Sequence, residues 1–463
     1  MARSQAPRQT PDQDLSKSYY LISLGCPKNL VDSQGIATLL QRAGCEPAHT
    51  PEEADILIVN TCGFIESARQ ESRAVLEELV ESKRPEQHLV AAGCYSQRFP
   101  FQLADDVPGI DGFLGTRRWM DILALVEKLE DRAEGPGPYV PVYQVPNVPT
   151  VGQDTKGVAR AVAQGSSAYL KISDGCRRSC AFCAIPLIKG PAVSRPPTEI
   201  LADAQRLAEV GTQEIILIAQ DTTDYGYDLA PEYDLAWLLE RLVKAVPSVP
   251  WIRIMYAYPG QITERLIATM ARHEQILPYL DLPLQHADAD VLRRMGRPAN
   301  IDSVANTIQS LRDAMPDIAV RTTFLVGYPG ETEEAFEGLL AFVEGMRFDR
   351  VGVFTYSEEE GTRAAELEDD VPYEVKEVRR QQLMAVQQPI SLARNQTLVG
   401  DTLAVLIEGQ DEQLSVGRSY RDAPEVDGLV LIREELPVGE IVRVQVVSAL
   451  EYDLIAQTPG AAG

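Results

Sequence analysis

Cys176-Arg-Arg-Ser-Cys180-Ala-Phe-Cys183 places three of the chain's seven cysteines within eight residues. The stretch directly follows an apolar segment, 168–173, whose length and composition are typical of a buried strand. Three thiolates do not complete a tetrahedral zinc site, and no Cys or His follows closely enough to be an obvious fourth ligand. In a 4Fe-4S cluster, three cysteines leave one iron open for another molecule. The stretch therefore predicts an iron–sulfur cluster, with zinc as its rival.

The segment before these cysteines is the first of six apolar runs, each followed by a helical pattern. The predicted strands are 168–173, 214–219, 251–258, 279–284, 319–326 and 350–356. The predicted helices are 198–210, 235–246, 263–272, 301–314, 333–346 and 373–394. Such an alternation predicts a partial (β/α)6 barrel of parallel strands, with the active site at the strand C-termini. The loop 176–183 should lie at that mouth.

Three more cysteines end short apolar runs in the N-terminal third of the chain. The runs are 19–26, 55–62 and 88–94, and they end in Cys26, Cys62 and Cys94. Intervening helical patterns predict an N-terminal domain with a parallel α/β sheet, whose strand C-termini share one edge. The three cysteines can therefore converge. The alternative is three buried cysteines that act as small hydrophobic residues. Cys45 follows a helix, and we interpret it as structural or as an exposed thiol without a role.

Together these patterns predict an α/β multidomain protein whose chain divides into five parts. We predict a disordered tail at 1–17, an N-terminal domain at 18–133, a proline-rich linker at 134–161, a core at 162–393 and a C-terminal module at 394–460. The polar start of the chain lacks the apolar segment of a signal peptide, and no run is long enough to span a bilayer. We expect a cytoplasmic location and no membrane partner.

The C-terminal module reads as a small antiparallel β-barrel of five short strands separated by turn signals. Between 395 and 458 it carries twelve acidic residues against four arginines, in a chain whose net charge is −25. This charge should repel a phosphate backbone and attract a basic protein. A simply solvated acidic face is the alternative. The module resembles the TRAM domain, which is usually considered to bind RNA.

The CxxxCxxC loop after the first barrel strand resembles the radical S-adenosylmethionine (SAM) enzymes. The resemblance implies that Cys176, Cys180 and Cys183 hold a 4Fe-4S cluster whose open iron binds SAM. It also implies that Phe182 lies beside the adenine. SAM would then be cleaved to a 5′-deoxyadenosyl radical that abstracts hydrogen from carbon.

Other strand ends carry further candidates for SAM contacts. Gln220 and Asp221 occupy the positions at which radical SAM enzymes contact the amino group of SAM. The sequence here departs from the Gly-Gly-Glu form that is common in that family. Gly327 lies in the glycine-containing segment near SAM, or alternatively in an ordinary turn before a helix. His286 is placed at the mouth as an acid–base group, a hydrogen-bond donor or a structural residue. Arg293 could meet the SAM carboxylate, but a solvated helix face is favoured.

The order of the parts resembles the methylthiotransferase family of radical SAM enzymes, over about residues 19–457. The resemblance implies that Cys26, Cys62 and Cys94 hold a second 4Fe-4S cluster, which carries or receives the inserted sulfur. The cofactors would be SAM and two 4Fe-4S clusters. Two branches compete. One modifies an adenosine in tRNA, and the RimO type modifies the β-carbon of an aspartate in ribosomal protein S-twelve.

The RimO-type branch is favoured by three stretches, 23–32, 220–226 and 417–428, and independently by the acidic terminal module. The predicted partners are ribosomal protein S-twelve and a low-potential electron donor such as a flavodoxin or ferredoxin, with tRNA as the alternative substrate. A non-catalytic, metal-stabilised RNA-binding scaffold is a hypothesis from another class. The net charge disfavours that scaffold.

Overall fold

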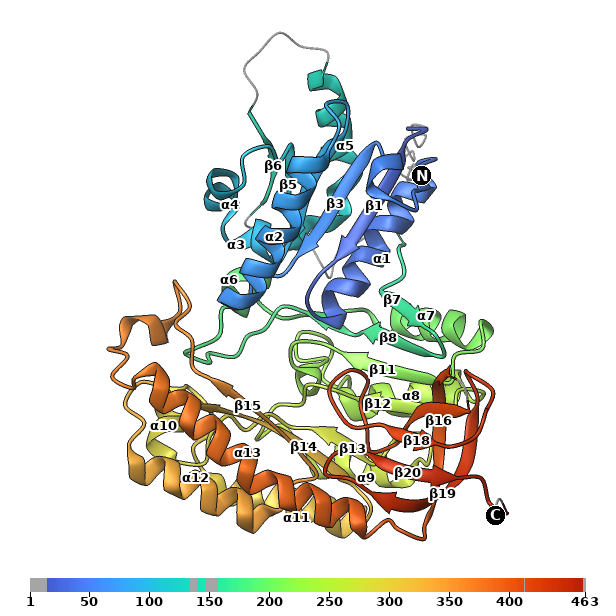
Figure 1. Ribbon diagram of the computed structural model, residues 1–463, viewed down its shortest axis with the longest axis vertical. Helices are drawn as coiled ribbons and strands as arrows, with labels where there is room; N and C mark the ends of the chain where they lie inside the picture. The colour runs from blue at the N-terminus through green and yellow to red at the C-terminus, as the bar shows by residue number, and fades with distance from the viewer. Residues whose placement is uncertain (1–14, 134–139, 147–156, 412, 461–463) are drawn as a thin grey trace, which may run out of the picture. The chain divides into compact units, whose positions relative to one another are not determined.

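The computed structural model describes residues 15–133, 140–146, 157–411 and 413–460 (Figure 1). The chain forms two compact units, Met1–Ala159 and Arg160–Gly463. Most of the predicted tail at 1–17 and much of the predicted linker at 134–161 lie outside the described residues. Among the helices of the described part, none combines the length and apolarity needed to cross a lipid bilayer.

The first unit is built on a parallel sheet, as predicted. Its strand order is β2-β1-β3-β4-β5-β6, and every pairing is parallel. The strands are β1 Ser18–Ser23, β2 Glu46–Pro47, β3 Ile56–Thr61, β4 His88–Gly93, β5 Gly112–Gly115 and β6 Val142–Gln144. The main helices are α1 Pro27–Arg42, α2 Glu66–Ser82 and α5 Ile122–Ala133. Strand β6 belongs to the predicted linker, so part of that segment extends the sheet instead.

Strand β3 shows why these apolar runs form central strands. All six of its residues are buried, because apolar cores pack on both faces of the sheet. Short apolar runs covered on both faces are typical of parallel sheets. Cys45 is 3% exposed within one of these cores, so its structural interpretation is right.

The second unit contains the predicted partial barrel. Its parallel strands are β8 Ser167–Lys171, β11 Glu214–Ile218, β12 Trp251–Ile254, β13 Tyr279–Asp281, β14 Ala319–Val326 and β15 Arg350–Thr355. The helices are α7 Pro197–Glu209, α8 Leu235–Ala245, α9 Glu264–Arg272, α10 Ala289–Arg294, α11 Ile301–Ala314, α12 Glu333–Met346 and α13 Tyr373–Gln396. A backbone hydrogen bond from the Ala257 amide to the Asp281 carbonyl, 2.9 Å, joins the segment after β12 to the last residue of β13. An unpredicted strand, β7 Ala161–Gln164, pairs antiparallel with β8.

The C-terminal module is a closed five-stranded barrel in the order β16-β17-β18-β20-β19. Its strands are β16 Thr402–Asp411, β17 Leu414–Ser419, β18 Val430–Ile432, β19 Ile441–Ala449 and β20 Leu454–Gln457. The small barrel is as predicted, except that β18 and β20 pair in parallel. Strands alternate in direction along the chain, so closing the barrel through β18 and β20 brings two strands of the same direction together.

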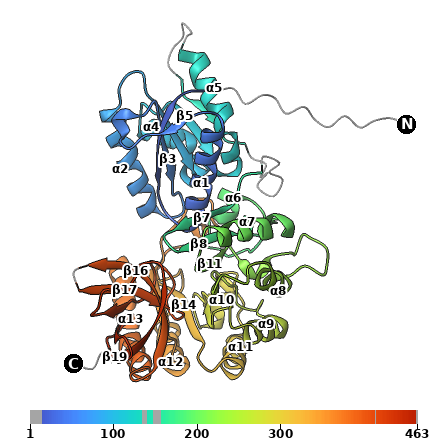
Figure 2. The ribbon, with the colours of Figure 1, turned by 90° about the vertical axis from the view of Figure 1, so that its right-hand side faces the viewer.

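This barrel is fastened to the N-terminal ends of the (β/α)6 strands. Glu214, the first residue of β11, contacts Arg253 of β12 and Arg418 of β17 at 2.6 Å each. All three side chains are at most 1% exposed. In both ribbon views the barrel lies against the strands of its unit (Figures 1 and 2). Buried charges require partners, so this triad specifies where the barrel docks.

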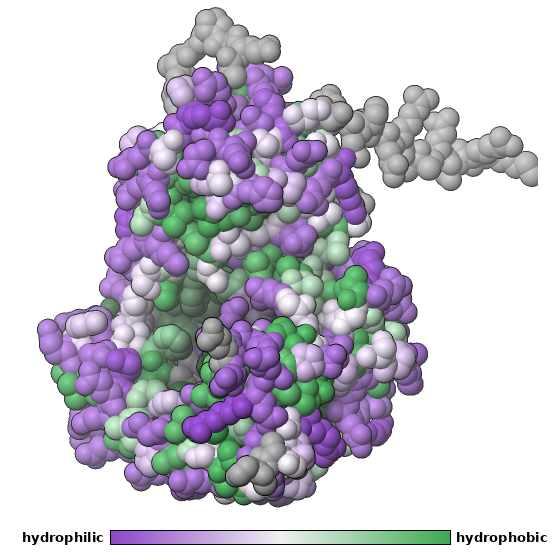
Figure 3. Space-filling view, turned by 45° about the vertical axis from the view of Figure 1, so that its right-hand side comes forward, coloured by the Kyte–Doolittle hydropathy of each residue, from purple (hydrophilic) through white to green (hydrophobic). Residues whose placement is uncertain are grey.

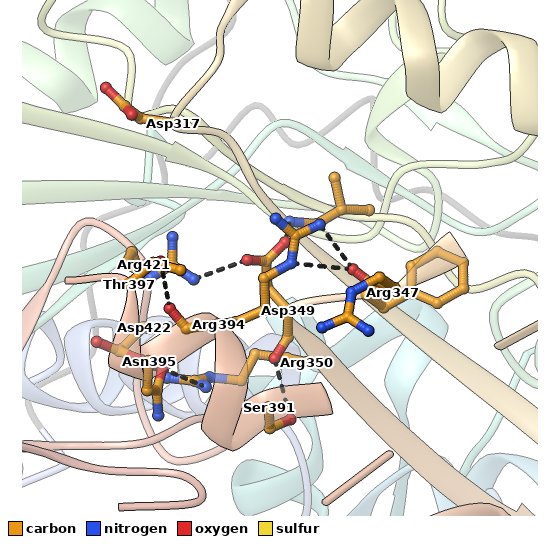
Figure 4. A network of polar contacts seen from close by, with 12 residues as sticks. Asp317, Arg347, Asp349, Arg350, Ser391, Arg394, Asn395, Thr397, Arg421 and Asp422 are labelled. Atoms are coloured by element: carbon orange, nitrogen blue, oxygen red, sulfur yellow. Dashed lines mark hydrogen bonds and ion pairs between the residues drawn. The ribbon is translucent and has the colours of Figure 1, made fainter. Parts of the chain in front are cut away.

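A second polar network reinforces the same contact (Figure 4). Arg421 reaches Asp349 at 2.7 Å, and Arg350 of β15 reaches Asp422 at 2.7 Å, in a reciprocal exchange of charges between barrel and core. Arg350 also donates to Asn395 at the end of α13. Two exchanged ion pairs fix orientation as well as position, because each arginine must meet its own carboxylate.

The docking changes the charge that the barrel presents to solvent. Arg418 and Arg421, two of its four arginines, are at most 6% exposed. Among the described residues of the module, the exposed acidic ones are Asp401, Glu408, Asp411, Glu425, Glu435 and Glu440. These six exposed carboxyl groups face two exposed arginines, Arg433 and Arg443, so the described free surface of the module remains acidic. Hydrophilic residues also predominate on the face of the molecule drawn in Figure 3.

Candidate functional site

The loop with Cys176, Cys180 and Cys183 begins where β8 and the short β9, Ser173–Asp174, reach the mouth of the partial barrel. Gly175 turns the chain there with φ +75°. A Cβ atom on Gly175 would lie 2.0 Å from the Pro191 carbonyl oxygen. Only glycine meets both demands, so residue 175 fixes the start of the loop against a neighbouring segment.

Two backbone bonds hold the middle of the loop. The Ala181 amide donates to the Met295 carbonyl at 2.8 Å, and the Ala364 amide donates to the Ala181 carbonyl at 2.9 Å. Ala181 is thus paired on both sides, by a segment after α10 and by one after β15. The structure supplies a rigid frame for the three cysteines from elements far apart in sequence.

Two arginines inside the loop bind the end of β11. Arg178 donates to Asp221 at 2.7 Å and to Asp224 at 2.9 Å. Arg177 binds both carboxylate oxygens of Asp224 at 2.7 Å. The structure therefore brings Asp221 to the loop, as its predicted role requires, but its carboxylate already holds an arginine. Gln220 is half-buried at the same strand end.

The chemistry of the thiols fits a cluster. Burial raises the pKa of Cys176 to about 11 and that of Cys183 to about 12. Without metal these thiols are protonated, so loading a cluster releases protons. In the described residues, no three His, Cys, Asp or Glu side chains gather around one point as a single metal ion requires. A 4Fe-4S cluster is larger and takes each thiolate on a different iron.

The N-terminal cysteines lie at the ends of adjacent strands. Cys26 precedes α1, Cys62 follows β3, and Cys94 follows β4, and β1, β3 and β4 are neighbours in the sheet. An ideal Cβ on Gly25 would lie 3.1 Å from the Cys62 sulfur, which shows how closely two of the segments approach. The structure thus brings the three predicted residues to one edge.

Asn29 joins these three segments, and sequence reasoning missed it. Its amide nitrogen donates to the Leu24 carbonyl at 3.1 Å and to the Thr61 carbonyl at 3.0 Å. Its side-chain oxygen accepts from the Cys94 sulfhydryl at 3.4 Å. Asn29 is 1% exposed. In the sequence, the only signal for this role was an amide side chain three residues after the strand-end cysteine Cys26.

Phe182 and Gly327, two predicted contacts to SAM, lie in different surroundings. Phe182 packs partly buried against the small core around Tyr328 and Tyr356. Gly327 has φ +70°, and a Cβ there would lie 2.2 Å from the Lys376 side chain. The close packing of Lys376 accounts for this glycine without a ligand, and a contact of Gly327 with SAM stays a prediction.

His286 is not open to the mouth. Its side chain is 0% exposed, its Nδ1 accepts from the Asp288 amide at 2.9 Å, and its Nε2 lies 3.5 Å from Glu331. This favours the structural alternative. Arg293 is 63% exposed and pairs with Asp290, so the solvated helix face is confirmed.

Two residues with strained backbones lie at the mouth of the partial barrel, and sequence reasoning overlooked both of them. Tyr256 and Gln285 follow β12 and β13 with φ of 60° and 75°. Positive φ is costly for residues with a Cβ, and it concentrates at functional sites. Two such residues at neighbouring strand ends support the assignment of this edge as the working face.

Comparisons with known proteins agree with this arrangement. Three family models match: the Radical SAM superfamily over 170–343, the uncharacterized protein family UPF0004 over 18–115, and the TRAM domain over 399–458. A relative from Chloroflexus aurantiacus, ribosomal protein uS12 methylthiotransferase RimO, is 50% identical, with 94% of this chain and 98% of the relative covered. A relative of the same name from Roseiflexus sp. strain RS-1 is 48% identical, with 94% and 96% covered. The radical SAM methyltransferase TsrM from Kitasatospora setae has a similar fold, with a TM-score of 0.56, 16% identity, and 74% and 75% coverage.

Proposed function

The chain belongs to the ribosomal protein uS12 methylthiotransferase (RimO) family of radical SAM enzymes, and on this premise we propose that it replaces a β-carbon hydrogen of an aspartate in uS12 by a methylthio group. One observation carries the chemistry: each unit places three cysteines at the C-terminal edge of its parallel strands, after three strands in the first unit and in one loop after β8 and β9 in the second. Methyl transfer alone needs one such site, whereas sulfur insertion uses a second. Ribosomal proteins are made and assembled in the cytoplasm, so we propose that the reaction takes place there.

The cysteines divide between two proposed clusters. Cys176, Cys180 and Cys183 would hold the SAM-binding 4Fe-4S cluster, and Cys26, Cys62 and Cys94 the other. When bound, the groups supply one electron to cleave SAM to a carbon radical, a site for the inserted sulfur and, from a second SAM, the methyl group. A low-potential flavodoxin or ferredoxin is the proposed source of that electron.

The chain's own residues prepare this chemistry. Arg177 and Arg178 fasten the loop to Asp221 and Asp224, so the three sulfurs keep their spacing when no group is bound. Fixing the ligands in advance lowers the entropy lost when the cofactor binds. Phe182 remains the proposed contact to adenine, with Gln220, Asp221 and Gly327 as further proposed contacts to SAM.

The acidic barrel supports a protein partner. Arg418 and Arg421 are used for docking, and the described free surface carries six exposed carboxyl groups against the exposed Arg433 and Arg443. Ribosomal proteins are generally basic because they bind RNA, and opposite charges accelerate and orient association. A tRNA backbone would meet repulsion at the same surface.

Product analysis tests the proposal. The anaerobically reconstituted protein should contain about eight irons per chain and form 5′-deoxyadenosine with SAM and reductant. Incubation with uS12 should add one methylthio group in place of hydrogen on an aspartate, located by tandem mass spectrometry. Addition to tRNA alone would overturn the substrate assignment. Zinc without SAM cleavage would overturn the enzyme class.

A further inference from the structure

Each sulfur of the radical SAM loop meets one hydrogen-bond donor. The Arg178 amide donates to the Cys176 sulfur at 3.4 Å. The backbone at Ile185 bonds to Cys183 and lowers the pKa of its thiol against the larger effect of burial. Both donors are backbone groups, so they come with the fold of the loop and carry no charge.

The donor to Cys180 is different, because it is a charged side chain from a distant segment. Nη1 of Arg297 lies 3.6 Å from the Cys180 sulfur, across 117 positions of sequence. Of the three donors, only the Arg297 side chain can therefore be changed without altering the loop backbone.

Arg297 is held in this place by three contacts. Its Nη2 donates to the Pro283 carbonyl, and its guanidinium stacks over the Tyr258 ring at 4.3 Å. Its backbone amide donates to the Leu292 carbonyl at 2.8 Å, at the end of α10. A side chain fixed at head and backbone loses little further freedom, so its position facing the sulfur is built into the apoprotein.

The charge of Arg297 is not neutralised by a carboxylate. Arg178 stacks on the Tyr258 ring at 4.4 Å, and it is paired with Asp221 and Asp224. Within the described part of the chain, Arg297 has no carboxylate at ion-pair distance, and its Nε is buried without a hydrogen-bond partner. The sulfurs therefore face one uncompensated positive charge.

We propose that Arg297 is a positioning residue that raises the reduction potential of the cluster at Cys176, Cys180 and Cys183; this rests on the proposed assignment of that cluster. Reduction adds one negative charge to the cluster. A cation that donates a hydrogen bond to a ligand sulfur stabilises the reduced form more than the oxidised form. Arg297 thereby makes entry of the electron easier before SAM is cleaved.

The test isolates one cluster and measures its potential without SAM. The full chain carrying Cys26→Ala, Cys62→Ala and Cys94→Ala serves as the parent, and it should load about four irons at the remaining site. The midpoint potential is read by titration with reductant and electron paramagnetic resonance. Arg297→Gln keeps a donor and much of the length but removes the charge. Arg293→Gln, on an exposed face of α10, is the matched control.

Arg297→Gln should lower the ratio of reduced to oxidised cluster at a fixed potential at least tenfold, which corresponds to about 59 mV. Arg293→Gln should stay within threefold of the parent, and Arg297→Lys, which keeps the charge without the fork, should lie between. If Arg297→Gln has the same midpoint potential as the parent, the proposal is overturned. If this variant loses only SAM binding, Arg297 is a substrate ligand instead. If the Gln variant does not load iron, Arg297→Met, which also lacks the charge, takes its place: a lowered potential supports the proposal and an unchanged one overturns it. A parent that binds no iron refutes the cluster assignment itself, which is a separate failure.

Discussion

Replacing Glu214 by glutamine should loosen the C-terminal barrel from the (β/α)6 core. Burial raises the pKa of Glu214, but Arg253 and Arg418 outweigh burial and lower it to about 2, from an ordinary value of 4.5. The difference corresponds to about 3 kcal/mol of stability at neutral pH. Glutamine would also leave two arginines buried without their shared carboxylate, and breaking a buried pair costs about 3–5 kcal/mol.

The pH dependence gives this prediction its sign. A carboxyl group whose pKa is lower in the folded state stabilises the fold above the unfolded pKa, and the benefit disappears as pH falls through the folded value. The stability gap between the parent and Glu214→Gln should therefore be full above about pH 5. It should shrink steadily as pH falls from 4.5 towards 2.

Urea unfolding of the second unit measures the gap. Trp237 and Trp251 report on that unit, and Trp119→Phe removes the tryptophan of the first unit from the signal. Glu209→Gln, an exposed carboxyl group at the end of α7, is the matched control and should change stability by less than about 0.5 kcal/mol. The reasoning is refuted if Glu214→Gln unfolds like this control at pH 7, or if the gap stays constant between pH 5 and pH 3.

Four further outcomes test the division of labour in the chain. Cys180→Ala should abolish formation of 5′-deoxyadenosine and leave about four irons; retained SAM cleavage would exclude the loop as the radical site. Cys62→Ala should keep part of the SAM cleavage but lose methylthiolation of uS12, so equal methylthiolation would contradict the second cluster. The double change Glu435→Lys and Glu440→Lys on the free barrel surface should weaken uS12 binding about tenfold at low salt. SAM cleavage should not change. A dissociation constant for uS12 that stays the same in this variant would argue against the barrel as a recognition surface. Gly327→Ala should destabilise the second unit by about 1–3 kcal/mol because its Cβ meets Lys376; a variant as stable as the parent would show that Lys376 moves aside freely.

Local sequence patterns predicted the parts of the molecule that depend on local rules. Alternating apolar runs and helical patterns located all six barrel strands, because parallel strands covered on both faces are mostly apolar. The strand-end position of Cys26, Cys62 and Cys94 followed from the same rule, since strand C-termini share an edge. These predictions required only residue type and order along the chain.

The long-range contacts around the site could not be predicted from the sequence. Arg297 meets Cys180 across 117 positions, and Arg418 meets Glu214 across 204. No periodicity links such pairs, because they depend on how whole elements pack. His286 shows the same limit in reverse: its strand-end position was predicted, but whether its side chain points to the mouth or into the core is decided by Glu331 and its neighbours.

The (β/α)6 strands separate the docked barrel from the cysteine loop. The barrel binds at their N-terminal ends, through Glu214, Asp349 and Arg350, whereas the cysteine loop lies at their C-terminal ends. Strands of five to eight residues are about 17–26 Å long. A partner held by the free barrel surface can present its aspartate only if a loop projects at least this far. This is why charge changes on the barrel should affect capture of the whole protein and leave SAM cleavage intact.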